Sequence, residues 1–257
     1  MTNDANQVPR NTYLFSLLAL QQRAFTVNTV IDIGAAEGGF FLTRANAQLF
    51  PLARHFFIDA MQENQESYRK LAGKFDAGYE ITALSCIDGE VVVRIDPHFY
   101  NTHVDHLQPA TTFGKTRRVP VCTLDGLVDR RQIKPPFMIK LDVQGAELDV
   151  LRGALRALDE AVIVTAEIQI FVERDTLVEL LAFMQGRGWA LYDITDQAYY
   201  PSDSTLYECY ATFIPQSMDF RKDTPWCPPD QEKMILERLR GRRAAILEQL
   251  DKLAARG

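Results

Sequence analysis

The chain has 257 residues, of which 47% are hydrophobic, enough to bury the core of one principal α/β domain with appended segments. Its net charge of −6 provides no overall basic field, so neither nucleic acid nor a membrane surface is expected as a partner. The four cysteines show neither paired metal spacing nor a dense disulfide pattern, and we find no signal peptide and no apolar run long enough to span a bilayer. We therefore expect free thiols and a cytoplasmic location.

The first third of the chain alternates apolar and polar segments. Residues 1–10 form a polar leader, and helical spacing predicts a helix over 13–25 that packs against the main domain. Strands are then expected at 30–33, 55–59 and 79–85, with helices at 40–49 and 62–73. This strand-helix-strand rhythm is typical of a parallel sheet with right-handed crossovers.

The pattern changes after Ser85. Asp88-Gly89 separates two β-rich runs, 80–84 and 90–95, and predicts a hairpin. Residues 96–115 have little periodicity and are expected to form a long loop. Further strands are predicted at 117–123, 137–141, 161–168, 191–194 and 206–214, and helices at 146–158 and 175–187.

The C-terminal segment, residues 216–257, has a sequence pattern unlike that of the preceding domain. Pro225, Pro228 and Pro229 indicate a stiff linker, and from residue 230 onward apolar residues recur at alternating three- and four-residue steps. This amphipathic helix could pack on its own domain or pair with a second subunit as a homodimer. The expected divisions are a leader and helix over 1–28, the main domain over 29–215, the linker over 216–229 and the helix over 230–257.

Residues 30–40 form an apolar run that stops at Gly34 and opens into a helix-like segment. A glycine turn before a helix N-terminus suits a nucleotide-like cofactor. Ala36 stands where a dinucleotide fingerprint has its second glycine, so the match to that fingerprint is weak. Asp32 could hold a cationic, amino-acid-like group, which S-adenosylmethionine carries and NAD lacks. On this stretch alone, the alternative is an ordinary turn with an exposed Asp32.

Three acids, Asp32, Asp59 and Asp142, lie at or near the carboxyl ends of apolar strands, where an open parallel sheet binds its ligand. Asp59 is placed to accept hydrogen bonds from both ribose hydroxyls of a nucleoside. Ala60 and Met61 follow it and could form an apolar wall against adenine, although Met61 could equally belong to the core.

Residues 139–154 carry the strongest motif, IKLDVQGAELDVLRGA. As plain structure, Asp142 would cap a helix and Glu147 would be a first-turn acid. The motif nevertheless resembles the signature segment of the FkbM-type methyltransferases, and 30–40 is similar to the cofactor loop of that family. Other matching segments follow in order at 57–59, 83–85 with 88–89, 121–125 and 166–167. The resemblance covers roughly 30–171 and excludes the first 25 residues and the C-terminal helix.

The resemblance implies an α/β fold with a Rossmann-like, doubly wound, mostly parallel sheet and helices on both faces. The helical patterns add the N-terminal helix and the C-terminal amphipathic helix to it. It also implies S-adenosyl-L-methionine as cofactor. Two departures from the family are Cys86, where an acid often follows Ser85, and Asp59-Ala60 in place of Glu-Pro. The expected cofactor-binding residues are Asp32, Gly34, Ala35, Ala36, Gly38, Asp59, Ala60, Met61, Ser85, Cys86 and Asp142.

Methyl transfer to an oxygen acceptor depends mainly on proximity and orientation, helped by a general base. Asp142 is the first candidate for that base, or for positioning the acceptor. Glu147 and Glu167 are the next candidates, and either could instead brace the turn.

The 96–115 segment contains His98, His103 and His106 together with two aspartates. Their spacing fits no standard metal signature, so no metal is expected. A histidine of this segment could still act as a base if the segment closes over the acceptor.

The leading hypothesis is therefore an S-adenosylmethionine-dependent O-methyltransferase acting on a hydroxyl of a sugar or secondary metabolite, with a small molecule or glycan as acceptor. A non-catalytic partner subunit that keeps the cofactor fold is an alternative, and a nicotinamide-dependent oxidoreductase is a weaker one. No motif identifies the acceptor, because specificity in such folds resides in irregular loops.

Overall fold

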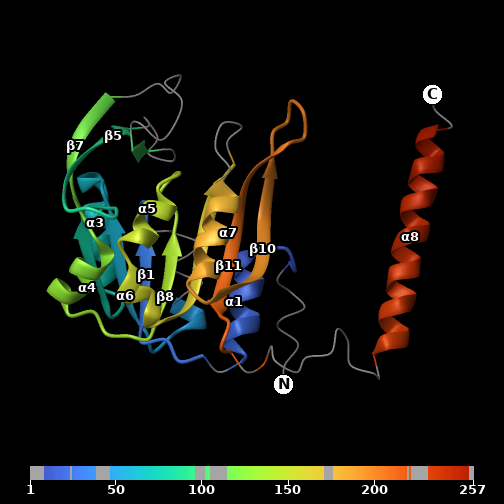
Figure 1. Ribbon diagram of the computed structural model, residues 1–257, viewed down its shortest axis with the longest axis horizontal. Coiled ribbons are helices and arrows are strands. Elements are labelled where there is room, and N and C mark those ends of the chain that lie inside the picture. Colours follow the sequence, from blue (N-terminus) through green and yellow to red (C-terminus); the bar gives the residue numbers. More distant parts are fainter. Residues whose placement is uncertain are drawn as a thin grey trace. The chain divides into compact units, whose positions relative to one another are not determined.

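A computed structural model of the chain describes residues 9–23, 25–38, 47–95, 102–104, 115–170, 176–218, 220 and 231–254. Seven strands form one sheet in the order β10-β11-β9-β8-β1-β2-β3 (Figure 1). They are β1 (Thr29–Ile33), β2 (Arg54–Asp59), β3 (Ala77–Ile81), β8 (Phe137–Leu141), β9 (Ala161–Gln169), β10 (Trp189–Tyr199) and β11 (Leu206–Pro215).

The large sheet is mostly parallel. Strands β3, β2, β1, β8 and β9 pair in parallel, whereas β11 pairs antiparallel with β9 and β10 antiparallel with β11. Strands β2 and β3 follow β1 toward one edge of the sheet, whereas β9 follows β8 toward the other edge. The strand order therefore reverses between β1 and β8. The predicted Rossmann-like, doubly wound fold is confirmed.

Both faces of the sheet carry helices, as shown by the alternate residues of β2. Phe57 stacks on Tyr68 with ring centroids 5.6 Å apart. Phe56 and Ile58 belong instead to the main core cluster, which includes Val150. Because successive strand residues point to opposite faces, the helices that carry Tyr68 and Val150 cover opposite faces.

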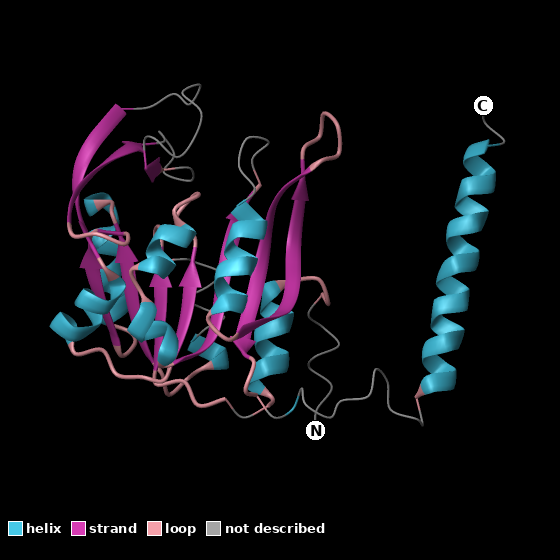
Figure 2. Cartoon of the chain, viewed as in Figure 1, coloured by secondary structure: helices cyan, strands magenta, loops and turns pink. Residues whose placement is uncertain are grey.

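The helices of this first part of the chain are visible in Figure 2. They are α1 (Tyr13–Gln21), the short 3₁₀ turn η2 (Gln62–Asn64), α3 (Gln65–Ala72), α4 (Leu124–Arg131), α5 (Glu147–Arg152), α6 (Leu155–Asp159) and α7 (Thr176–Gly186). Helix α1 packs on β10 and β11, because the Tyr13 ring stacks on Tyr210 and Ser16 donates a 2.7 Å hydrogen bond to Asp193. The predicted helix over 40–49 lies largely outside the described residues.

A second sheet has the order β4-β7-β5-β6, with β4 (Ala83–Leu84), β5 (Gly89–Ile95), β6 (His103–Val104) and β7 (Lys115–Cys122). The predicted hairpin between 80–84 and 90–95 is wrong, because β7 lies between β4 and β5 and pairs with both. Asp88 accepts a 3.2 Å hydrogen bond from the Thr123 amide just beyond β7, so the turn residues fasten β7 instead of closing a hairpin.

The single helix predicted over 146–158 is also wrong, since Gly153 and Ala154 separate α5 from α6. A Cβ atom at Gly153 would lie 2.1 Å from the backbone oxygen of Ser85, so the break lets two backbones approach closely. Helix α4 was not predicted. Its signal is Thr123, whose side chain accepts a 3.1 Å hydrogen bond from the Gly126 amide as an N-cap.

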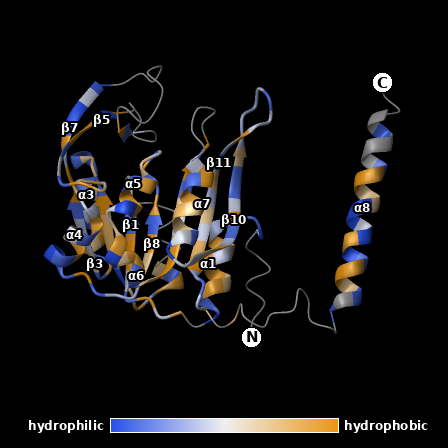
Figure 3. Ribbon diagram, viewed as in Figure 1, coloured by the Kyte–Doolittle hydropathy of each residue, from blue (hydrophilic) through white to orange (hydrophobic). Residues whose placement is uncertain are grey.

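The chain divides after Pro215 into two compact units, and the second contains α8 (Glu232–Ala254). Figure 3 shows hydrophobic and hydrophilic residues interspersed along α8. Leu236, Leu239 and Ile246 keep 39%, 53% and 49% of their surface exposed. Among the described helices, none is both long and apolar enough to cross a membrane.

Candidate functional site

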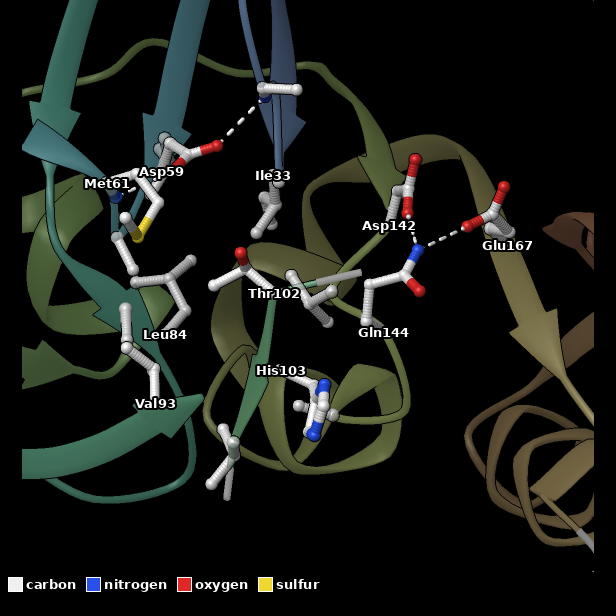
Figure 4. A pocket seen from close by; sticks show the side chains of 18 of the residues that line it. Ile33, Asp59, Met61, Leu84, Val93, Thr102, His103, Asp142, Gln144 and Glu167 are labelled. Atoms are coloured by element: carbon white, nitrogen blue, oxygen red, sulfur yellow. Dashed lines mark hydrogen bonds between the residues drawn. The ribbon is translucent and has the colours of Figure 1, made fainter. Parts of the chain in front are cut away.

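A cavity of about 460 Å³ lies at the carboxyl ends of β1, β2 and β8, and residues of both sheets line it (Figure 4). Its position coincides with the reversal of strand order between β1 and β8, where open α/β sheets bind their ligands. The volume falls within the range of small-molecule sites, roughly 300–1,000 Å³. This cavity is therefore the candidate active site.

The glycine turn after β1 forms one wall of the cavity. Gly34 has φ +71°, and a Cβ atom there would lie 1.7 Å from the backbone oxygen of Asp142, so only glycine lets the turn pass the end of β8. Ala36 has φ +50°, a conformation that L-residues rarely adopt. Its amide donates to Asp59 at 2.9 Å and its carbonyl accepts from the Tyr68 hydroxyl at 2.5 Å. These bonds hold the turn in a strained, defined shape.

Asp59 at the end of β2 is fixed by backbone donors. One carboxylate oxygen accepts from the Ala36 amide and the other accepts from the Met61 amide at 2.7 Å. Burial raises the pKa of Asp59 above its ordinary value, and the amide donors oppose that shift. Met61, Leu84 and Val93 stand on the same side of the cavity (Figure 4). A rigid carboxyl group thus adjoins an apolar wall.

Asp32 does not line the cavity, and its expected contact with the cofactor stays a prediction. Its side chain is 2% exposed and forms an ion pair with Lys140, with Oδ1 3.4 Å from Nζ. The same Nζ lies 3.1 Å from Asp142 Oδ2 and 3.4 Å from the Gly34 carbonyl. Asp32 therefore holds Lys140 in position, and Lys140 in turn contacts the glycine turn and the end of β8.

Asp142, Gln144 and Glu167 form a hydrogen-bonded group along another wall of the cavity (Figure 4). The Gln144 amide nitrogen donates to Asp142 and to Glu167, both at 2.9 Å. The Gln144 carbonyl accepts from Gln169. The backbone of Gln144 has φ +56°, so this group also depends on a strained residue.

The two carboxyl groups of this wall have opposite protonation preferences. Burial disfavours the charge of Asp142, but Lys140 and hydrogen bonds from Glu167 and Gln144 outweigh it and hold the pKa of Asp142 below its ordinary value. Burial and the neighbouring Asp142 raise the pKa of Glu167 well above its ordinary value. At neutral pH, Glu167 is accordingly the protonated partner and Asp142 the ionised one.

Glu147 is outside the cavity lining. It is 4% exposed, and its Oε1 accepts from the Val143 amide at 3.0 Å and the Gly145 amide at 3.2 Å. Burial raises the pKa of Glu147 to about 7. These contacts correspond to the bracing role that the sequence left open for this residue.

The predicted site residues thus divide into two groups. The cavity brings together seven of them: Gly34, Ala36, Asp59, Ala60, Met61, Asp142 and Glu167. The other six lie outside its lining: Asp32, Ala35, Gly38, Ser85, Cys86 and Glu147. The Gly38 amide closes the turn onto the Ala35 carbonyl at 2.9 Å, and the Ser85 amide bonds to the Cys122 carbonyl at 3.1 Å, so these segments support the fold around the cavity.

Several lining residues were missed as site residues. Gln144 lies within the signature segment, and its position two residues after Asp142 was the available signal. Thr102 and His103 come from the segment expected to be a loop, and nothing in the sequence indicates that β6 joins the cavity wall. His98 and His106 lie outside the described residues. The described part of the chain contains no cluster of three potential metal ligands.

Comparison with known proteins is consistent with these observations. Residues 32–192 match the family model described as the methyltransferase FkbM domain. The structure of methyltransferase FkbM from Methylobacillus flagellatus KT is similar at 16% identity with a TM-score of 0.44, over 72% of this chain and 43% of that one. This chain therefore aligns with less than half of that structure.

Two further structures are similar at lower identity. One is an rRNA methylase from Streptococcus thermophilus, with 11% identity and a TM-score of 0.45 over 81% of this chain and 98% of that one. The other is precorrin-6y C5,15-methyltransferase from Geobacter metallireducens GS-15, with 12% identity and a TM-score of 0.39 over 77% and 86%. No curated protein matches the chain. Because the family match spans more than half of its residues, the chain belongs to the FkbM methyltransferase family.

Proposed function

We propose that the cavity binds S-adenosyl-L-methionine and that the protein transfers its methyl group to a hydroxyl oxygen of a sugar or secondary metabolite. The observation that carries this proposal is the meeting of Asp59, the Gly34 turn and Asp142 around one cavity at the β1/β8 reversal. Family membership supports methyl transfer as the reaction class.

The lining chemistry fits the two ends of this cofactor. The Ala36 and Met61 amides hold the Asp59 carboxyl group at the end of β2, where it can accept from a ribose hydroxyl. The apolar side chains of Met61, Leu84 and Val93 suit an adenine ring. At the other end, the Gly34 backbone and the ionised Asp142 offer polar groups to the charged methionine portion.

When bound, S-adenosylmethionine supplies an electrophilic methyl group on a positively charged sulfur that leaves as a neutral thioether. Little help is needed at the leaving group, so the protein contributes chiefly proximity and orientation. We assign Asp142 a positioning role, because Lys140 and Gln144 already engage its two oxygens. Glu167 holds Gln144 in place, and Glu147 braces the turn that carries it.

A hydroxyl-bearing acceptor is supported by the remaining wall of the cavity. Gln169 and Glu208 line it and provide amide and carboxyl oxygens that can accept hydrogen bonds from hydroxyls. The proposed partners are accordingly a small molecule or glycan, without nucleic acid or membrane. A homodimer through α8 is proposed as well, on the apolar spacing of that helix, and a cytoplasmic location on the free thiols of Cys86, Cys122 and Cys209.

Calorimetric titration with S-adenosylhomocysteine tests the cofactor assignment. The wild-type protein should bind it, and Asp59→Ala should weaken binding at least about tenfold, because the substitution removes the ribose acceptor and the anchor of the Ala36 turn. Asp76→Ala is the matched control, since the Asp76 side chain is 80% exposed and should leave binding unchanged. Binding of NADH without binding of S-adenosylhomocysteine would contradict the proposal.

A further inference from the structure

Tyr210 of β11 lies directly opposite Glu167 of β9 in the large sheet. Side chains paired in this way stand on one face of the sheet, with Cβ atoms about 4.5–5.5 Å apart. The Tyr210 hydroxyl donates a hydrogen bond to Glu167, and this bond opposes the rise in the pKa of that carboxyl group. Glu167 lines the cavity and Tyr210 is outside its described lining. Tyr210 therefore reaches the cavity wall through Glu167.

Helix α1 holds Tyr210 from its other side. The Tyr13 ring stacks on the Tyr210 ring, with centroids 5.1 Å apart and an angle of 28° between the ring planes. The Tyr13 amide donates to Asp196 of β10 at 2.6 Å, and the Ser16 hydroxyl donates to Asp193 at 2.7 Å. These hydrogen bonds fasten α1 to β10, and the helix in turn keeps its aromatic ring against Tyr210.

The contacts continue from Glu167 to Asp142 along the cavity wall (Figure 4). Gln144 Nε2 lies 2.9 Å from Glu167 Oε2 and 2.9 Å from Asp142 Oδ1, so one amide group donates to both carboxyl groups. The carbonyl oxygen of the same amide accepts from Gln169. Both ends of the Gln144 amide are engaged, and a displacement of Glu167 therefore disturbs the donor that orients Asp142.

We propose that Tyr210 is a positioning residue for Asp142. It acts through the hydrogen bonds of Glu167 and Gln144, and the Tyr13 ring holds it in place. The inference rests on the proposed function, in which the Asp142 carboxylate meets the charged methionine portion of the cofactor. Tyr13 and Tyr210 both lie outside residues 32–192, the segment that the family model matches. The N-terminal helix and β11 thus add a support to the site from outside that segment.

Calorimetric titration with S-adenosylhomocysteine measures the effect of Tyr210 on ligand binding. Tyr210→Phe keeps the ring that stacks on Tyr13 and removes the hydroxyl, so binding should weaken about three- to tenfold, as expected for the loss of one hydrogen bond. Tyr207→Phe is the matched control, because it removes a hydroxyl from the same strand. Tyr207 is three residues from Tyr210, hence on the opposite face of the sheet, where its ring contacts Tyr200. The control should bind as tightly as the wild type.

A double-mutant cycle separates a positioning role of Tyr210 from a purely structural one. If Tyr210 acts through Gln144, then Tyr210→Phe should cause no further loss of affinity in a protein that already carries Gln144→Ala. A purely structural role predicts the same loss in both backgrounds, or a lower melting temperature with unchanged affinity. Thermal unfolding of each variant verifies that folded proteins are compared.

Tyr13→Leu tests the contact with α1 independently, because it removes the stacked ring and keeps the Tyr210 hydroxyl. It should also weaken binding, and again only when Gln144 is present. Unchanged affinity of Tyr210→Phe or Tyr13→Leu would overturn the inference, as would equal losses with and without Gln144. Absence of S-adenosylhomocysteine binding to the wild-type protein would instead reject the proposed function, so the two failures are distinguishable.

Discussion

At the residue scale, the site is built around the buried ammonium of Lys140. Its Nζ contacts Asp32, Asp142 and the Gly34 carbonyl within 3.4 Å. Burial opposes the charge of Lys140, but the two aspartates outweigh it and raise the pKa of Lys140 above its ordinary value. One side chain therefore joins the glycine turn to the end of β8.

Replacing Lys140 with methionine should destabilise the fold strongly. Lys140→Met leaves two carboxylates without their cation, and breaking a buried ion pair in this way costs about 3–5 kcal/mol. Urea unfolding measures the loss. Lys70→Met is the control, because Lys70 is 71% exposed and the substitution removes only a surface ion pair with Glu66, whose Oε1 lies 3.9 Å from Lys70 Nζ. Adding Asp32→Asn to Lys140→Met should recover part of the stability. Equal stability of the Lys140 and Lys70 variants would contradict this account.

Glu147 should make stability depend on pH. Its pKa is raised by burial from 4.5 to about 7, so between these pH values the folded protein binds more protons than the unfolded chain. Its contribution is full below pH 4.5, decreases as the pH rises and is lost above about 7, for a total of about 3 kcal/mol.

Glu147→Gln isolates this effect, because a glutamine oxygen can still accept from the Val143 and Gly145 amides but does not titrate. Free energies of unfolding measured between pH 4.5 and 8 should fall more steeply for the wild type than for the variant. Parallel curves would show that Glu147 titrates normally.

At the scale of elements, the break between α5 and α6 decides how the second sheet meets the first. Gly153 brings that break against the backbone of Ser85, which follows β4. Two helices and a sheet edge therefore meet at a residue without a side chain.

Gly153→Ala should accordingly lower stability by about 1–3 kcal/mol or more, because its Cβ would lie 2.1 Å from the Ser85 oxygen and the backbones must move apart. Gly186→Ala at the end of α7 is the matched control, since its Cβ would meet nothing within 4 Å. That control should be neutral or stabilising by up to about 1 kcal/mol. Thermal unfolding compares the two variants, and equal melting temperatures would argue against the close approach.

At the scale of the whole molecule, α8 belongs to the second compact unit of the chain. If it pairs two subunits as proposed, light scattering should give about twice the chain mass of 29.2 kDa. Leu239→Glu and Ile246→Glu place charges on the apolar row and should reduce the mass to that of one chain. Arg238→Glu lies one position outside that row and should leave the dimer intact. A monomeric wild-type protein would reject the proposal.

The sequence by itself determined the elements that follow local patterns. Apolar runs and helical periodicity placed most strands of the large sheet, and the acids at their ends predicted the cavity side of the sheet, where Asp59 and Asp142 line the cavity. Many residues of the signature segment match the family motif position by position, and this match identified the family. These signals are local because they depend on residues close together along the chain.

Only the tertiary structure decided which distant segments meet. In the structure β7 lies between β4 and β5, and Asp32 forms an ion pair with the buried Lys140. His103 of β6 lies in the lining of the cavity. An acid after an apolar strand looks the same in sequence whether it faces a cofactor or a buried lysine. The difference arises from strand pairing and burial, which depend on residues far apart in the chain.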